Sequence, residues 1–323
     1  MKDGFGREIE YMRVSITDRC DLRCKYCMPD GCERVPMDRI LKYEEIARIV
    51  EAASTLGIKR IKVTGGEPFV RPGCTTLLKM LKDIKGIEEV TVTTNGQQLE
   101  GYIDELKAIG IDGINISLDT LDTEKYRELT GRGDLDKTLK SIEAALASGI
   151  RTKINCLPQR GLNDEELCDL VSFACERGLD MRFIETMPIG AASTDKGMPG
   201  TEVLKVLKEK WPGIEADPKR HGNGPAVYYK IPGMSGSVGL ISPLSGRFCG
   251  SCNRIRLTSQ GSLVPCLAYD SGTDLKPYLA KSDDELRAAI AETIVNKPAG
   301  HDFERRKNDD DPASRRLMSE LGG

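Results

Sequence analysis

The chain has 323 residues, with 47 Lys and Arg against 50 Asp and Glu and a formal net charge of −3. This length allows a large hydrophobic core and one large domain with an appendage. The charge balance shows no basic excess, which argues against a nucleic acid polymer as partner. No apolar run reaches the length needed to cross a bilayer. We therefore expect neither a nucleic acid polymer nor a membrane as partner.

The cysteine content points to a reducing compartment. Eleven cysteines are present, an odd number, and six of them fall in two tight groups. In a chain of this size, that distribution does not indicate a disulfide framework. The opening residues Met1-Lys2-Asp3-Gly4 lead into polar sequence without the apolar segment of a signal peptide. We expect a cytoplasmic protein.

The first predicted strand, 12–17, leads directly to three cysteines, Cys20, Cys24 and Cys27. Their spacing, Cys-x3-Cys-x2-Cys, can direct three thiolates at one centre, but the loop offers no fourth. A [4Fe–4S] cube held by three cysteines keeps one iron open to a small molecule. Structural zinc would need a fourth ligand from elsewhere in the chain. The spacing therefore favours an iron–sulfur cluster.

After this loop, a helix, a glycine and a β-rich run recur five times. The helical segments carry apolar residues at helical spacing, and short β-rich runs follow them. The expected helices are 43–56, 77–84, 99–109, 135–148 and a last one that begins with a capping box of Asn163 and Glu166 and ends at Gly178. The expected further strands are 60–64, 89–94, 113–118, 151–155 and 181–185.

Six strands, all expected to be parallel, predict an α/β fold. A complete eight-stranded barrel takes about 250 residues, whereas this repeat ends near Met187. An open, six-stranded partial β/α barrel fits best. A doubly wound sheet remains the alternative, because alternation alone does not distinguish closure from winding.

Polar and special residues collect where these strands end. In both architectures the carboxyl ends of the strands hold the ligands, so we expect one active face. The double glycine in Thr64-Gly65-Gly66-Glu67-Pro68 lets a backbone approach a ligand closely, although an ordinary strand-to-helix turn is the alternative. The other ends carry Thr93-Thr94-Asn95-Gly96, Ser117-Leu118-Asp119, Asn155 and Glu185-Thr186-Met187-Pro188.

The pattern changes after Pro188, because Gly and Pro become frequent at 190–200 and again at 222–239. We predict a first domain at 1–188. Residues 189–323 are predicted to form a linker and a smaller α+β extension that ends in a mixed-charge tail at 304–316.

This extension carries the second cysteine group, Cys249-x2-Cys252-x13-Cys266. The three thiols fit a second cube with an open iron, or a zinc site that borrows His221 or Cys32 as its fourth ligand. Two arginines follow, Arg254 and Arg256, which project to the same side of a strand. Their guanidinium groups suit a phosphate; a solvated basic edge strand is the alternative.

The first cysteine group and the Gly65-Gly66-Glu67-Pro68 turn resemble motifs of the radical S-adenosylmethionine (SAM) enzymes, in which the open iron holds the amino and carboxylate groups of SAM. With the second cysteine group and its two arginines, the pattern is similar over essentially the whole chain to the GTP 3′,8-cyclase family of molybdenum cofactor biosynthesis. The resemblance implies the partial barrel, two [4Fe–4S] clusters and SAM. It also implies conversion of GTP to 3′,8-cyclo-7,8-dihydro-GTP by a 5′-deoxyadenosyl radical that takes hydrogen from ribose C3′.

The resemblance also implies roles for individual positions and for partners. The metal ligands would be Cys20, Cys24, Cys27, Cys249, Cys252 and Cys266, and the SAM-binding residues Tyr26, Gly66, Ser117 and Met187. The GTP-binding residues would be Arg13, Lys62, Thr93, Lys153, Arg254, Ile255 and Arg256. Lys62 departs from the family, in which Arg is common there. The implied partners are a flavodoxin-like or ferredoxin-like reductant, a downstream cyclic pyranopterin monophosphate synthase and a second copy in a homodimer.

The chain's last residues resemble the family's double-glycine tail, which reaches back into the active site, with Leu321 in place of the usual Ile. Cys32 matches no position of the family pattern, and His301 has no assigned role.

Two other functions remain as hypotheses. One is a radical SAM peptide-modifying enzyme with an auxiliary cluster, although such enzymes usually carry more than three C-terminal cysteines. The other is a zinc-stabilised nucleotide-binding protein without catalysis, which predicts bound zinc and no cleavage of SAM.

Overall fold

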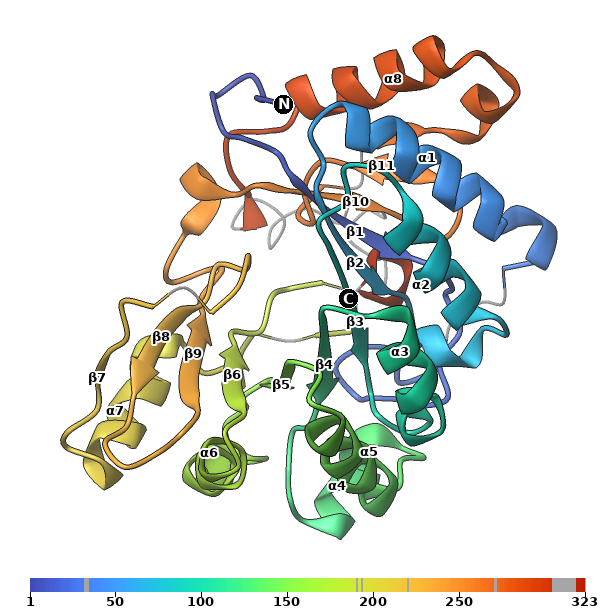
Figure 1. Cartoon of the computed structure of the whole chain (residues 1–323). Coiled ribbons are helices and arrows are strands. Elements are labelled where there is room, and N and C mark those ends of the chain that lie inside the picture. Colours follow the sequence, from blue (N-terminus) through green and yellow to red (C-terminus); the bar gives the residue numbers. More distant parts are fainter. Residues whose placement is uncertain are drawn as a thin grey trace.

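The structure is a computed structural model. It describes residues 1–31, 35–189, 191–192, 194–219, 221–269, 272–303 and 318–322. The strands of this part form a twelve-stranded sheet in the order β12-β11-β10-β1-β2-β3-β4-β5-β6-β9-β8-β7 (Figure 1). Cys32 and the mixed-charge segment 304–316 lie outside the described residues.

The six central strands are parallel and lie side by side in the order of the chain. They are β1 (Tyr11–Ser15), β2 (Arg60–Thr64), β3 (Glu89–Thr94), β4 (Gly113–Ser117), β5 (Thr152–Cys156) and β6 (Asp180–Ile184). In a doubly wound sheet the order of the strands reverses at one point, whereas β1 to β6 follow one another without a reversal. The predicted six-stranded parallel partial barrel is confirmed.

Helices connect these strands, and the apolar spacing predicted most of them. They are α1 (Tyr43–Thr55), α2 (Cys74–Asp83), α3 (Ile103–Ile109), α4 (Thr123–Thr130), α5 (Leu135–Ser148) and α6 (Leu167–Glu176). Short 3-10 turns lie at Met37–Arg39, Pro68–Val70, Leu99–Tyr102 and Asp164–Glu166. Helix α4 was not predicted: its eight residues are mostly polar, and its N-cap Asp122, which accepts a hydrogen bond from the Lys125 amide, was the remaining signal.

The predicted capping box at Asn163 and Glu166 is wrong. The Glu166 carboxylate accepts a hydrogen bond from the Thr120 hydroxyl (2.6 Å), and the Asn163 amide donates to the Asp119 carbonyl (2.8 Å). Both side chains therefore bond to the loop after β4 rather than to the first turn of α6. Tertiary partners outcompeted the local cap, which sequence spacing alone does not reveal.

The C-terminal elements extend the same sheet at both edges. They are α7 (Gly200–Lys210), β7 (Glu215–Ala216), β8 (Val227–Lys230), β9 (Ser237–Ile241), β10 (Arg254–Leu257), β11 (Ser262–Val264), β12 (Thr273–Asp274), α8 (Asp283–Val295) and α10 (Met318–Leu321), with 3-10 turns at Phe248–Ser251 and Lys276–Ala280. Strand β9 pairs in parallel with β6, and β10 pairs in parallel with β1. The α+β extension thus adds strands to the barrel, and the boundary at 188/189 stays a prediction.

The segment 242–253 joins these two edges. It leaves the carboxyl end of β9 beside β6 and enters the amino end of β10 beside β1. All four strands run in the same direction, so the segment crosses the open side of the partial barrel obliquely. Two of the second group's cysteines, Cys249 and Cys252, lie on it. The crossing places them against the interior of the barrel.

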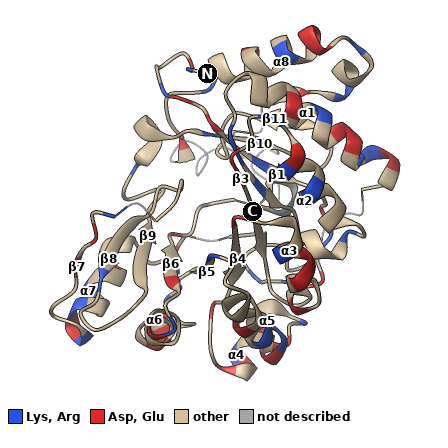
Figure 2. Ribbon diagram, in the orientation of Figure 1, with Lys and Arg blue, Asp and Glu red and all other residues tan. Residues whose placement is uncertain are grey.

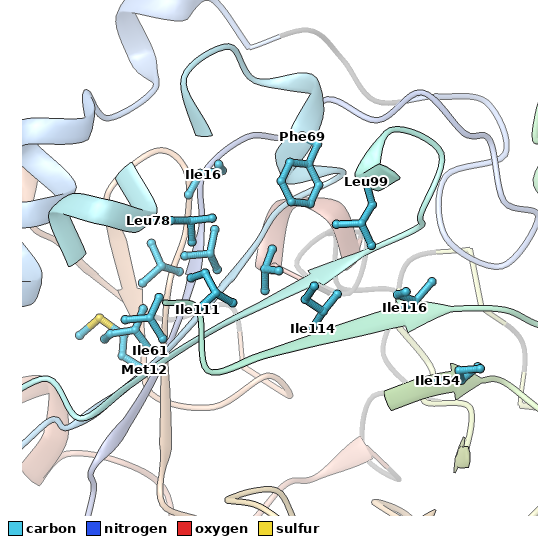
Figure 3. Close-up of a cluster of buried hydrophobic side chains, with 14 of the residues drawn as sticks. Met12, Ile16, Ile61, Phe69, Leu78, Leu99, Ile111, Ile114, Ile116 and Ile154 are labelled. Carbon is cyan, nitrogen blue, oxygen red and sulfur yellow. The ribbon is translucent and has the colours of Figure 1, made fainter. Parts of the chain in front are cut away.

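The hydrophobic core lies between the sheet and its outer helices (Figure 3). On β1, β2 and β4 the side chains of Met12, Ile61 and Ile114 are fully buried in it. Because strand side chains alternate between faces, their neighbours Arg13 and Lys62 point to the opposite side, the barrel lumen. Acidic and basic residues also alternate along the outer helices, and basic residues lie on the strands near β1 (Figure 2). Among the described residues no helix is long and apolar enough to span a bilayer.

Candidate functional site

The three cysteines of the first group line one cavity at the carboxyl end of the strands. It has a volume of about 230 Å³ and also contains the Gly65-Gly66-Glu67 turn. The sulfur of Cys20 accepts hydrogen bonds from the Leu22 amide (3.4 Å) and the Asn95 side chain (3.8 Å). Burial raises the pKa of Cys20 to about 12, and the bond from the Leu22 amide opposes this. A bound iron would deprotonate such a thiol, so three cysteines that line one cavity fit a cluster with one open iron.

The double glycine packs against the loop that carries these cysteines. The Gly66 amide donates to the Thr17 carbonyl (2.7 Å), and the Glu67 amide donates to the Arg19 carbonyl (2.8 Å). A Cβ on Gly66 would lie 2.3 Å from the Arg19 carbonyl oxygen, so only glycine allows this approach. The Glu67 carboxylate also accepts from the Asn95 amide (2.7 Å), which ties the turn to the end of β3.

All four predicted SAM-binding residues line this same cavity: Tyr26, Gly66, Ser117 and Met187. The Tyr26 hydroxyl donates to Asp119 (2.6 Å), whose other oxygen accepts from the Leu157 amide (2.8 Å). Burial raises the pKa of Asp119, although the bond from Tyr26 opposes this. Asp119 thus orients Tyr26, a role that the sequence analysis did not assign. Its position directly after a buried strand was the available signal.

The second group's cysteines line another cavity, of about 200 Å³, next to the start of β10. Cys252 precedes β10, and Cys266 follows β11, which runs antiparallel to β10. Arg254 donates a hydrogen bond to the Cys252 sulfur (3.7 Å). Burial raises the pKa of Cys252, but Arg254 and Lys297 lower it to about 7, which favours the thiolate that a metal needs.

His221 does not join this second group. Its ring lies between Asp180 (3.1 Å) and Asp217 (2.9 Å), stacked on Tyr228, and it lines a separate cavity of about 300 Å³ with the amino-terminal parts of the strands. The zinc site that would borrow His221 is therefore not formed in this structure. In the described residues no three His, Cys, Asp or Glu side chains converge on one metal ion; the thiolates of a cube bind separate irons.

The two cysteine sites adjoin opposite ends of β1. The first follows its carboxyl end, while the amides of Glu10 and Tyr11 at its amino end donate to the Asn253 carbonyl beside Cys252. At about 3.3 Å per residue, the five residues of β1 separate the sites by about 17 Å. The expectation of one active face is therefore incomplete, because the site extends through the lumen.

Buried cations occupy the lumen between the two sites. Arg13 on β1 lies opposite Arg256 on β10 and opposite Lys62 on β2, all with their side chains on the lumen face. Neighbouring strands are about 4.8 Å apart, and like charges at that spacing repel. Burial, reinforced by neighbouring cations, lowers the pKa of Lys62 and of Arg256 well below the ordinary values. A row of cations at this spacing suits a polyanion.

Two further buried cations lie toward the amino ends of the strands: Arg182 lines the second cysteine cavity, whereas Lys153 lines the His221 cavity and neither cysteine cavity. Lys153 is held by Asp180 (2.8 Å) and the Tyr228 hydroxyl (3.0 Å). Arg182 donates a hydrogen bond to the Asn115 side chain. This residue was not predicted as a site residue, although its alternation with the buried residues of β6 was an available sequence signal. Several buried polar atoms that line the cavities have no hydrogen-bond partner among the described residues, so they are available to a bound ligand or an ordered water. They are Arg182 Nε, Asn155 Oδ1, Thr186 Oγ1 and His301 Nδ1.

The remaining predicted residues differ in where they lie. Thr93 lines both cavities. Ile255 lines neither: its side chain is fully buried in the hydrophobic core, so a contact with a ligand in the lumen would come from its backbone. The tail does enter the lumen, because Arg256 donates to the Gly322 carbonyl (2.6 Å) and Leu321 is buried.

Comparisons with known proteins agree with this geometry. Residues 14–174 match the radical SAM superfamily, and residues 179–303 match the family described as Molybdenum Cofactor Synthesis C. A GTP 3′,8-cyclase of Clostridium perfringens strain 13 is 41% identical over 326 residues, covering all of both chains. The chain belongs to the GTP 3′,8-cyclase family. Another member, from Rhizobium etli strain CIAT 652, is 42% identical over all of this chain and 94% of its own.

A solved structure shows the same fold at lower identity. Streptococcus suis SuiB bound to S-adenosylmethionine superposes with a TM-score of 0.67 and 17% identity, over 97% of this chain and 77% of SuiB. At this identity the likeness concerns the fold alone. In this chain, the fold carries a first cysteine loop at the strand ends and a second cysteine site to which the crossing segment contributes Cys249 and Cys252.

The contact of Gly66 with the cysteine loop predicts the effect of a methyl group there. Gly66→Ala should lower the free energy of unfolding by about 1–3 kcal/mol, because the loop must shift to admit the Cβ. Iron bound at the first site should fall with it. Denaturant unfolding and iron analysis measure both, with Gly101→Ala as control, since a Cβ there meets nothing within 4 Å. Equal values for the two variants would contradict the packing role.

Proposed function

We propose that the protein converts GTP to 3′,8-cyclo-7,8-dihydro-GTP, the first step of molybdopterin biosynthesis. The observation that carries this proposal is the row Arg256–Arg13–Lys62, buried between two three-cysteine sites. A triphosphate supplies the negative charge that this row needs, since burying either partner alone is costly. Relatives named GTP 3′,8-cyclase at 41–42% identity over the full chain support the same reaction.

We assign the cofactors to the two cysteine groups. Cys20, Cys24 and Cys27 would hold the [4Fe–4S] cluster that binds SAM, and Cys249, Cys252 and Cys266 a second [4Fe–4S] cluster. When bound, reduced cluster and SAM supply a 5′-deoxyadenosyl radical, which removes hydrogen from ribose C3′ before the sugar closes onto C8 of guanine. The chain's own residues bind and orient the reactants.

The protein residues then have positional roles. Tyr26, held by Asp119, would border the adenine of SAM, while the Gly66 backbone would receive its amino group. Ser117 and Met187 would line the ribose and adenine. The triphosphate would contact lumen residues, and the guanine would face the second cluster. The proposed GTP contacts are Arg13, Lys62, Thr93, Lys153, Arg254, Arg256 and the Ile255 backbone, to which we add Arg182.

Peptide modification has less support. SuiB has also been solved with its precursor peptide, and that structure superposes with a TM-score of 0.64 at 16% identity, a likeness of fold alone. A peptide gives no reason for three cations in adjacent strand positions. The zinc-stabilised binding protein likewise leaves the first cavity, with its double glycine and three thiols, without a role.

The same proposal extends to partners and location. Reductive cleavage of SAM consumes electrons, so we propose a flavodoxin-like or ferredoxin-like donor. The product requires a further enzyme, a cyclic pyranopterin monophosphate synthase. Oxygen-sensitive clusters suit the cytoplasm, and the family resemblance supports a homodimer.

Anaerobic reconstitution tests the proposal. The protein is loaded with iron and sulfide, then incubated with dithionite, SAM and GTP, and the products are analysed by mass spectrometry. We expect about eight irons per chain, from two cubes, together with 5′-deoxyadenosine and a cyclised GTP. Formation of 5′-deoxyadenosine without a GTP product would contradict GTP as the substrate. Bound zinc without 5′-deoxyadenosine would contradict a radical SAM activity.

Replacing one second-group cysteine should separate the two half-reactions. Cys249→Ala should keep slow formation of 5′-deoxyadenosine, because the first site is intact, but lose cyclisation of GTP. Cys168→Ala, a cysteine on α6 outside both cavities, is the control and should keep both. Normal cyclisation by Cys249→Ala would show that the second cysteine group does not serve the substrate.

Lys62 predicts a pH dependence of GTP binding. Burial, then Arg182 and Arg13, lower its pKa well below the usual value, whereas a bound triphosphate favours the charged form and raises it. Between these two pKa values, binding takes up as much as about one proton, so affinity falls as the pH rises through that interval. Calorimetry in two buffers of different ionisation heat measures the uptake. Lys62→Arg should abolish the proton uptake, because a guanidinium stays protonated. Unchanged uptake would show that another group takes up the proton.

A further inference from the structure

Residues 1–10, here called the N-terminal strap, precede β1 and have no role in the site described so far. The strap folds back on itself: the Ile9 amide donates to the Met1 carbonyl, and the backbones of Lys2 and Glu8 form an antiparallel β-bridge. Its Gly4 amide donates to the Val295 carbonyl at the end of α8 (3.0 Å). Figure 1 shows the N-terminus beside α8. The strap therefore lies against the segment that follows α8.

Asp3 organises the turn of the strap. One carboxylate oxygen accepts from the Phe5 and Arg7 amides (both 2.9 Å), and the other accepts from Arg7 Nε (2.6 Å). The Asp3 side chain is fully buried and that of Arg7 nearly so. Burial by itself would raise the pKa of Asp3, but the bonds from Arg7 and Phe5 lower it overall. The pair is a buried, hydrogen-bonded ion pair that fixes the direction of the guanidinium.

The other four N–H groups of Arg7 all point at backbone carbonyls far away in the sequence. Nη1 donates to the carbonyls of Cys249 (2.9 Å) and Ala299 (2.8 Å). Nη2 donates to those of Pro298 (2.6 Å) and Lys297 (3.4 Å). One guanidinium thus joins the crossing segment of the second cysteine group to the segment 297–299.

The segment 297–299 is itself part of the second site. Lys297 donates through Nζ to the carbonyl of Pro265, the residue before Cys266. A Cβ on Gly300 would lie 3.7 Å from the Cys249 sulfur, and His301 lines the cavity with the cysteines. Arg7 therefore connects the Cys249 loop directly, and the Cys266 loop through Lys297.

We propose that Arg7, oriented by Asp3, is a positioning residue for the second cluster and hence for the guanine end of the substrate. This inference rests on the proposed function. The physical reason is that all five N–H groups of the guanidinium are hydrogen-bonded inside the fold. The guanidinium therefore fixes the distance between the Cys249 loop and the segment 297–299. It touches neither cluster nor substrate, and acts through the Cys249 and Lys297 backbones.

Three variants and one control test the role. Arg7→Met removes both the positive charge and the N–H groups that bond the carbonyls. Arg7→Lys keeps the charge but not the planar guanidinium, and Asp3→Asn leaves the guanidinium without its carboxylate. Arg48→Met is the control: Arg48 also joins backbone carbonyls, those of Leu279 and Lys281, and pairs with Asp283, but away from both cysteine groups. All proteins are reconstituted as full chains with iron, sulfide and SAM.

Three readouts are followed. Hydrogen exchange on the protein before iron loading should show faster exchange at 249–252 and 297–301 in Arg7→Met, with 20–31 unchanged. After loading, the change that GTP produces in the electron paramagnetic resonance spectrum of the second cluster should weaken. Cyclisation should fall by about 10- to 100-fold, the usual effect of losing an outer-shell partner, while 5′-deoxyadenosine formation stays within about twofold. Arg7→Lys and Asp3→Asn should lie between Arg7→Met and wild type.

Other results would overturn the proposal. If Arg7→Met and Arg48→Met behave alike in all three readouts, Arg7 serves general stability only. If Arg7→Met does not fold, Asp3→Asn decides: equal loss of exchange protection at 20–31 and at 249–252 would again indicate general stability. A wild-type protein that cleaves SAM without any GTP-dependent spectral change would instead contradict the proposed function, which separates the two failures.

Discussion

The repulsion among Arg256, Arg13 and Lys62 is the constraint on which the rest of the site depends. These residues occupy adjacent positions on β10, β1 and β2, and their side chains share the lumen face. In most barrels this interior is filled by apolar side chains. Here the apolar residues of the same strands pack outward against the helices, and the interior carries charge. Stability thus comes from the sheet–helix layer, which leaves the lumen to the ligand.

An open barrel makes this arrangement possible. Six strands do not close, and the chain fills the open side with the segment 242–253. That segment brings Cys249 and Cys252 to the amino end of β1, while the first cysteine group sits at its carboxyl end. The tail supplies backbone carbonyls to Arg256 from inside the lumen. Arg256 is therefore partly satisfied by the chain's own carbonyls, which accept its hydrogen bonds but leave its charge in place.

Much of this could be predicted from the sequence, for identifiable reasons. Strands and helices followed from apolar spacing, and both cysteine groups from their local pattern. Arg254 and Arg256 could be placed on one face because strand side chains alternate. Long-range partners were not predictable in this way. The Asn163–Glu166 pair has the residues of a capping box but bonds to the loop after β4 instead.

Other roles were missed for the same reason. Arg182 lies in a predicted strand, where alternation with buried residues gives the face of its side chain, but the residues that it meets depend on how the strands pair. Asp119 and Arg7 act by holding other residues, and nothing in their local sequence names those partners. The expectation of one active face did not place the second cysteine site at the other end of β1, since the crossing from β9 to β10 is a property of the sheet.

Diffraction from crystals of the reconstituted protein with GTP, collected at the iron absorption edge, tests the central claim most directly. The account predicts two separate iron clusters, one in each cysteine cavity and roughly 17 Å apart along β1, with the triphosphate between them against Arg13, Lys62 and Arg256. A single iron cluster, or a nucleotide bound outside the lumen, would contradict it.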